Sequence, residues 1–98
     1  MFLVQRVFTR PNTEVAFYAP TAEFKSHYKT AYKDTEKFLS NTVTLSPDRL
    51  KQVMSTMWAD EATWEAYKAD AICVAHFAAR NAYNDANGIT AERTTAVL

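Results

Sequence analysis

Two histidines, one cysteine and a dense group of aromatic residues are the side chains of this 98-residue sequence best suited to chemistry. Most of them lie in one stretch, MWADEATWEAYKADAICVAHFAAR, at residues 57–80. Within it, His76 follows Ile72 at helical spacing on an apolar stripe and precedes Arg80 by one turn. A buried imidazole needs partners for its ring nitrogens, which either the core or a ligand can provide. His76 is therefore either a satisfied core histidine or a candidate catalytic residue.

Aromatic residues close to His76, and a histidine–tyrosine pair on an earlier helix, allow the same two interpretations. Packing of a helix on a sheet explains large aromatic side chains, but such side chains also form the walls of small-molecule pockets. If the two helices face a common cavity, these residues line a site for an aromatic or hydrophobic ligand. The candidate pocket residues are Trp58, Tyr67, His27, Tyr28 and Trp64.

Other classes of site fit the sequence poorly. A closed zinc site would need several carboxylates beside the histidines, and Glu23 and Asp70 have no ligand-like spacing to them. Gly88 is the only glycine, which excludes a phosphate-binding loop, and Cys73 has no activating neighbour in the sequence. We therefore expect neither a metal nor a cofactor.

Composition limits the partners and the location. Lys plus Arg equals Asp plus Glu at 11 each, so no overall positive field draws the protein to nucleic acid or to an anionic membrane. A single cysteine excludes a disulfide framework within the chain, and no apolar run reaches the length of a signal peptide or a membrane span. We expect a soluble, cytoplasmic protein in which residues 1–98 form one domain.

Hydrophobic periodicity predicts the order strand, helix, strand, strand, helix, strand. In the first strand, Phe2, Val4 and Phe8 lie on one side and Leu3 and Val7 on the other. Thr21 is a candidate N-cap for the first helix, and Pro47 and Asp48 suit the turn of a hairpin. The predicted strands are residues 2–8, 38–45, 50–58 and 89–98, the helices begin at 21 and 60, and residues 14–20 are extended, with an edge strand possible.

The second helix runs from Asp60 at least to Tyr83, with Gly88 available for a left-handed C-cap and Asp70 able to recap the chain partway. On an unbroken helix, Ala71 and three further alanines at three- and four-residue steps share an arc with the aromatic residues at its start. Small residues there let a helix approach a sheet closely. This pattern predicts an alanine face turned toward the sheet.

The order βαββαβ predicts an α+β fold of the ferredoxin-like type, with a four-stranded antiparallel sheet and two helices on one face. Apolar residues occur on both sides of the first strand and of the hairpin, so the second sheet face also needs a cover. A second copy of the sheet is the natural cover. We therefore expect a homodimer formed by sheet-to-sheet packing, although the sequence does not limit assembly to a dimer.

The hairpin TVTLSPDRLKQVMSTMW, the acidic turn and aromatic helix ADEATWEAYKAD, and the histidine-bearing AICVAHFAAR together resemble a known superfamily. These segments, which cover roughly residues 38–83, are similar to those of dimeric α+β barrels, including the antibiotic-biosynthesis-type monooxygenases. The resemblance implies two sheets packed across a dimer, with a pocket between sheet and helices in each protomer. It also implies either cofactor-independent oxygenation of polycyclic aromatics or, near the position of His76, haem binding and degradation.

Two functions of different kinds follow, and the sequence does not decide whether the protein is an enzyme. The first is a small-molecule-binding protein, in enzymatic form a cofactor-independent monooxygenase in which His76 or a pocket tyrosine assists deprotonation. The second is a non-catalytic dimerisation or interaction module whose aromatic residues are all core. A haem-binding or haem-degrading monooxygenase is a third alternative. A cavity open to solvent, with a His76 nitrogen that points into it and has no protein partner, would favour the first, and a pocket filled by side chains would favour the second.

Overall fold

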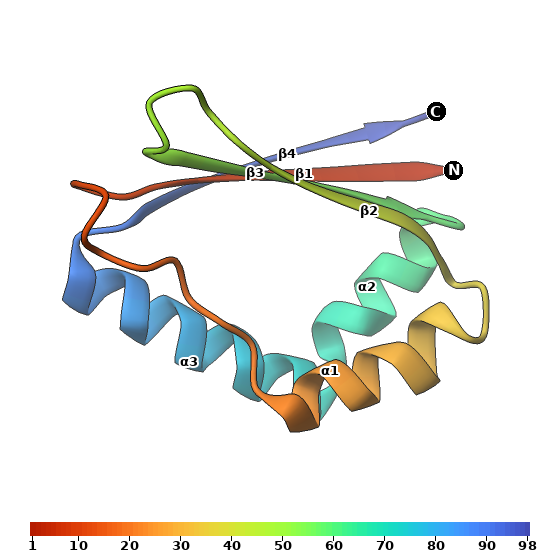
Figure 1. The fold of residues 1–98 in the computed structure, drawn as a ribbon. Coiled ribbons are helices and arrows are strands. Elements are labelled where there is room, and N and C mark those ends of the chain that lie inside the picture. Colours follow the sequence, from red (N-terminus) through yellow and green to blue (C-terminus); the bar gives the residue numbers. More distant parts are fainter.

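Four antiparallel strands form one sheet, and all helices lie on the same face of it (Figure 1). The computed structural model describes residues 1–98. The strands are β1 (Phe2–Thr9), β2 (Phe38–Leu45), β3 (Lys51–Trp58) and β4 (Thr90–Val97), arranged in the order β2-β3-β1-β4. The helices are α1 (Ala22–Tyr28), which continues into the π-helix η1 (Lys29–Lys33), α2 (Glu61–Ala69) and α3 (Ala71–Asn87). The predicted ferredoxin-like α+β fold is confirmed, and the second predicted helix is divided in two.

Side-chain caps define the helix ends as the sequence predicts. Thr21 accepts a hydrogen bond from the backbone N–H of Phe24 at the start of α1. Gly88 ends α3 in the left-handed conformation, with φ 67°. Asp70 is the C-cap of α2 and also the N-cap of α3, where its carboxylate accepts from the N–H of Ile72 at 3.0 Å. The chain is therefore recapped at Asp70, and α3 starts in a new direction.

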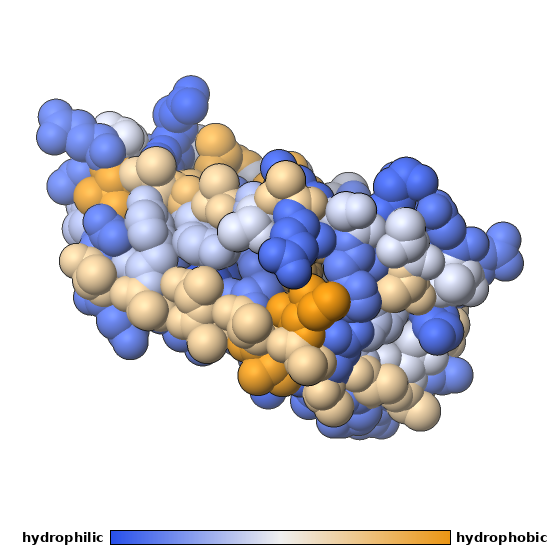
Figure 2. Space-filling view, turned by 90° about the horizontal axis from the view of Figure 1, so that it is seen from below, coloured by the Kyte–Doolittle hydropathy of each residue, from blue (hydrophilic) through white to orange (hydrophobic).

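This break makes the predicted alanine face wrong. With α3 turned relative to α2, the side chains that it directs inward include Cys73, His76, Phe77 and Arg80, while Ala71 and the alanines that follow it are exposed. Figure 2, which views the helical side of the molecule, shows moderately apolar residues lying among hydrophilic ones on this surface. Because α3 starts anew at Asp70, a different set of its side chains faces the sheet than on one continuous helix. That set includes two polar side chains, His76 and Arg80.

The segment between β1 and α1 is extended but forms no strand, so the possible edge strand at residues 14–20 is absent. It runs beside α3 below the sheet (Figure 1), and the hydroxyl of Tyr83 donates a hydrogen bond to the carbonyl of Ala16. Arg10 holds its start, because the guanidinium donates to the carbonyls of Val15, at 3.0 Å, and Arg49, at 2.8 Å. The segment thus forms a wall beside α3.

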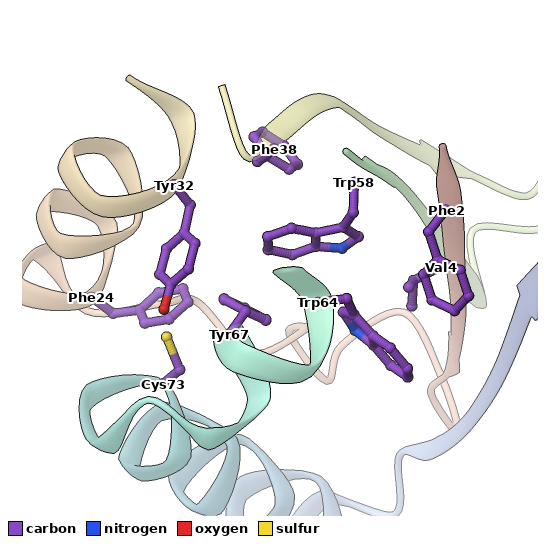
Figure 3. Packing of buried hydrophobic residues seen from close by; sticks show 9 residues of the cluster. All are labelled: Phe2, Val4, Phe24, Tyr32, Phe38, Trp58, Trp64, Tyr67 and Cys73. Carbon is purple, nitrogen blue, oxygen red and sulfur yellow. The ribbon is translucent and has the colours of Figure 1, made fainter. Parts of the chain in front are cut away.

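A cluster of nine buried residues fills the space between the helices and the β1–β3 part of the sheet. In Figure 3 the Trp58 indole lies between Phe38 and Tyr67, and the Tyr32 hydroxyl is directed toward Cys73. The rings of Trp58 and Tyr67 have centroids 4.6 Å apart, within the range of favourable aromatic packing. The full cluster is Phe2, Val4, Phe24, Tyr32, Phe38, Trp58, Trp64, Tyr67 and Cys73.

The other face of the sheet is covered by no element of the chain (Figure 1). Register places Leu3 beside Met57 and Val7 beside Val53, and these four apolar side chains alternate with the residues that face the helices. They are only half-buried within one chain. The predicted division of β1 into two apolar sides is therefore confirmed. None of the helices is both long and apolar enough to cross a membrane.

Candidate functional site

His76 is held on α3 by aromatic stacking. Its ring lies on the ring of Phe24 with centroids 3.7 Å apart and planes inclined by 9°, and Tyr18 packs against it with centroids 5.7 Å apart. Its Nδ1 atom is buried and has no hydrogen-bond partner. Buried polar atoms in proteins are nearly always paired, because an unpaired one costs desolvation free energy. His76 is therefore positioned by its neighbours while at least one ring nitrogen stays unsatisfied.

The His76 ring lines a cavity of about 290 Å³ between the sheet and α3. The strands contribute Phe8 and Met54 to its walls, and the segment before α1 contributes Phe17 and Tyr18. Arg80, one turn after His76, supplies a charged side chain to the same cavity, and its Nε is buried without a partner. The walls of this cavity combine apolar and aromatic side chains with polar ones, since Asn41, Gln52 and Asn84 also line it. Such a combination can bind and orient a small molecule.

His76 is a neutral imidazole at neutral pH. Burial, followed by the positive charges of Arg80 and Arg6, lowers the pKa of His76 to about 4. A neutral imidazole carries one ring nitrogen that can accept a proton. The site therefore combines a potential proton acceptor with the nearby positive charge of Arg80.

His27 belongs to a different group of side chains. Its Nε2 lies 2.7 Å from Oδ2 of Asp70, and the same carboxylate oxygen accepts a hydrogen bond of 2.6 Å from the hydroxyl of Tyr32. The Tyr32 bond and the contact with His27 hold the pKa of Asp70 down at about 2. Cys73 brings a third potential metal-ligand atom within 4.8 Å of those of His27 and Asp70, but its thiol is fully buried, and burial raises its pKa to about 11. These groups join α1 and η1 to the start of α3.

Known proteins share the architecture of this chain but little of its sequence. No family model and no curated protein matches the sequence. Among solved structures, SnoaB, a cofactor-independent oxygenase from Streptomyces nogalater, superposes with a TM-score of 0.65 at 19% identity, covering 99% of this chain and 91% of that one. An antibiotic biosynthesis monooxygenase superposes with a TM-score of 0.60 at 12% identity, covering 98% of this chain and 97% of that one. The fold is that of the antibiotic biosynthesis monooxygenases.

A dimeric ferredoxin-like protein from an uncultured marine organism shares this monooxygenase fold, with a TM-score of 0.59 at 15% identity over 99% of this chain and 95% of that one. At these identities the likeness concerns the path of the backbone. The chemistry has to be argued from the side chains of this protein.

The sequence-predicted pocket residues do not form one group in this ferredoxin-like fold. Trp58, Trp64 and Tyr67 are at most 6% exposed and lie in the buried cluster. Tyr28 packs against that cluster and borders a separate cavity at α1 and β2, and His27 is paired with Asp70. The structure thus places His76 and its cavity on one side of the core and the other predicted residues within or around the core.

Several residues around His76 escaped sequence reasoning. Nothing in the sequence indicated that the ring of Phe24 stacks on His76, and Tyr18 lies in a segment without any periodic pattern. Arg6 carried a detectable signal, because it occupies an inward position of β1 between Val4 and Phe8. A charged residue on the buried side of a central strand is unusual and indicates a polar site nearby.

Proposed function

We propose that the protein is a cofactor-independent monooxygenase that acts on an aromatic or hydrophobic small molecule in the His76 cavity. One observation carries this proposal: His76 is stacked in place and borders an open cavity, yet its buried Nδ1 has no protein partner. A core histidine would be expected to have its ring nitrogens satisfied. The similarity in fold to SnoaB supports an oxygenase within this class of site.

The reaction that suits this site begins with proton abstraction. A ring nitrogen of neutral His76 takes a proton from a CH₂ group that a carbonyl conjugated through an aromatic ring activates, leaving an enolate. The guanidinium of Arg80, which lines the same cavity, stabilises the negative oxygen of that enolate. The electron-rich carbon then reduces O₂, and the overall change is CH₂ plus O₂ to C=O plus H₂O. Molecular oxygen is the oxidant, so the balance requires no bound redox group.

A non-catalytic dimerisation or interaction module is the competing function. It accounts well for Trp58, Trp64 and Tyr67, which are core residues. It leaves unexplained both the open cavity and the unpartnered nitrogen beside it. Haem binding fits less well, because a cavity of about 290 Å³ lies at the lower end of small-molecule sites and a tetrapyrrole is larger than most ligands of such sites.

We further propose that two copies pack through their open sheet faces, as the sequence led us to expect. Leu3, Val7, Val53 and Met57 form an apolar patch that one chain leaves half-buried. The fold is shared with a dimeric ferredoxin-like protein, which supports this arrangement. A single domain and a cytoplasmic location remain part of the proposal, and the buried free thiol of Cys73 is compatible with a reducing compartment.

The oxygenase proposal can be tested with anthrone, a polycyclic aromatic compound whose CH₂ group is activated by a carbonyl across the ring. Anthraquinone formation and O₂ consumption are measured without added metal or cofactor, after subtraction of the spontaneous rate. We expect turnover by the wild type and a loss of at least about 100-fold in His76→Phe, which keeps a ring on Phe24 but removes the base. Equal rates for the two proteins would remove His76 from the mechanism, and no rate above background would refute this substrate class.

A further inference from the structure

Three arginines converge on a second cavity, of about 380 Å³, that adjoins the His76 cavity. Arg6 comes from β1, Arg80 from α3 and Arg93 from β4. The two cavities share Phe8 and Arg80 in their walls, so they meet at the Arg80 side chain. A molecule of neutral total charge therefore contains a local concentration of positive charge next to its candidate site.

The charges of this cluster are not balanced by the protein. Arg6 and Arg93 are direct partners in the β1–β4 register, so two like charges face each other across adjacent strands, which is destabilising. The ion pairs of the molecule are His27 with Asp70, Lys29 with Asp34, and Lys68 with Glu65, and none involves the three arginines.

Two further charged residues, Glu92 and Lys68, also line this second cavity. The carboxylate of Glu92 forms no ion pair with Arg6, Arg80 or Arg93, and Lys68 is already paired with Glu65 at 3.2 Å. The three arginines therefore outnumber the one carboxylate that lines the cavity, and none of them is held in an ion pair.

Aromatic rings hold the guanidinium groups in place. Arg80 lies over Phe8 and Phe77 at 5.3 Å from each centroid, Arg6 over Phe77 at 5.9 Å, and Arg93 over Trp64 at 5.2 Å. Contacts at these distances fall within the range of cation–π attraction and use none of the N–H groups of the guanidinium, which stay available for an acceptor. The arginines are thus positioned without their hydrogen-bonding capacity being used.

Arg10 shows what a structural arginine looks like in the same protein. It is 9% exposed, and its guanidinium donates to two main-chain carbonyls. Arg80, in contrast, has a buried Nε with no partner. Burial and the neighbouring Arg80 lower the pKa of Arg6 to about 10, which still leaves Arg6 charged at neutral pH. The cluster therefore combines two half-buried arginines, Arg6 and Arg80, with the exposed Arg93, and none of the three has an ion-pair partner.

We propose that Arg6, Arg80 and Arg93 form an anion subsite that binds the carboxylate of an aromatic acid whose ring system occupies the His76 cavity. This inference rests on the proposed function and specifies its substrate class. Carboxylates match the in-plane donors of guanidinium groups and commonly bind them in bidentate fashion. The ligand needs a permanent negative charge in addition to the transient enolate, because Arg6 and Arg93 line only the second cavity. Three cations also exceed what the one developing charge of an enolate would balance.

The test compares two probes of nearly equal shape, 1-naphthoate and its neutral analogue 1-naphthamide, by isothermal titration calorimetry at pH 7 and constant ionic strength. We expect the wild type to bind the naphthoate at least about ten-fold more tightly. Arg6→Gln and Arg93→Gln should each remove that preference while retaining naphthamide binding. Arg49→Gln, which makes the same charge change at the exposed hairpin turn, is the matched control and should keep the preference.

The outcomes separate this inference from the proposed function. Equal binding of both probes overturns the anion subsite and leaves the aromatic cavity standing. If neither naphthalene binds but sulfate raises the melting temperature of the wild type and not that of Arg6→Gln, the anion subsite stands and the aromatic cavity fails. If no probe binds, and Arg93→Gln converts a dimer to a monomer, the arginines serve contacts between copies and the inference is wrong.

Discussion

Replacement of His76 should make the protein less sensitive to acid. In the folded chain, burial and the charges of Arg80 and Arg6 lower the pKa of His76 to about 4, whereas an unfolded histidine titrates near 6.5. Between these two values the unfolded state binds more protons than the folded state, so the free energy of unfolding decreases as the pH falls from 6.5 to 4. Above pH 6.5 His76 is neutral in both states, so its protonation no longer lowers the free energy of unfolding.

The size of the effect follows from the same two values. A shift of the pKa from 6.5 in the unfolded chain to about 4 in the folded chain corresponds by linkage to a decrease of about 3 kcal/mol in the free energy of unfolding at low pH. The ring is only partly buried, and solvent screens part of its interaction with the arginines. We therefore expect about 1–2 kcal/mol of acid-dependent destabilisation from this residue.

Urea denaturation of the wild type, His76→Phe and His76→Leu at pH values from 4 to 7 provides the measurement. Carboxylates titrate in all three proteins, so the difference between wild type and variant isolates the histidine. That difference should shift in favour of each variant by about 1–2 kcal/mol as the pH falls from 7 to 4. A difference that stays constant over this range would show that His76 is not desolvated beside Arg80 and would refute the reasoning.

Three further predictions concern charge, backbone and assembly. Arg6→Gln should raise the free energy of unfolding of the ligand-free protein by about 0.5–1 kcal/mol in urea, because it removes the charge opposite Arg93, while Arg49→Gln changes little; a loss of stability in Arg6→Gln would mean that the cluster is internally balanced. Gly88→Ala should lower stability by about 1 kcal/mol, since φ there is 67°, and an unchanged melting temperature would contradict the left-handed cap. Val53→Lys should convert a dimer to a monomer near 11 kDa in sedimentation at micromolar concentration, and a wild type that is already monomeric would refute sheet-to-sheet packing.

Local sequence signals were sufficient for most of the fold. Alternation divides β1 into two apolar sides, Thr21 caps α1, and Gly88 ends α3 in the predicted conformation. These features depend on a few neighbouring residues and on simple sterics, which is why they can be recognised without the structure. The alanine face failed because it assumed one continuous helix. The carboxylate of Asp70, which the sequence indicated as able to recap the chain, does so and turns α3, and the same carboxylate also contacts Tyr32 and His27.

The candidate site was only partly predictable for a related reason. His76 was singled out because a histidine on an apolar stripe needs partners for its ring nitrogens. In the structure its Nδ1 has no such partner. The arginine cluster could not be assembled from the sequence. Arg6 and Arg93 meet through the β1–β4 register, and Arg80 joins them only when α3 packs across the sheet. Relations of this kind come from tertiary structure and have no local signature.

The ring resonances of His76 during a pH titration, followed by NMR with and without saturating 1-naphthoate, test the central claim most directly. The account predicts that the pKa of His76 lies near 4 in the free protein and changes when the ring system enters the cavity and the carboxylate offsets the charges of Arg80 and Arg6. His76 resonances that titrate identically with and without the ligand would contradict a functional site at this histidine.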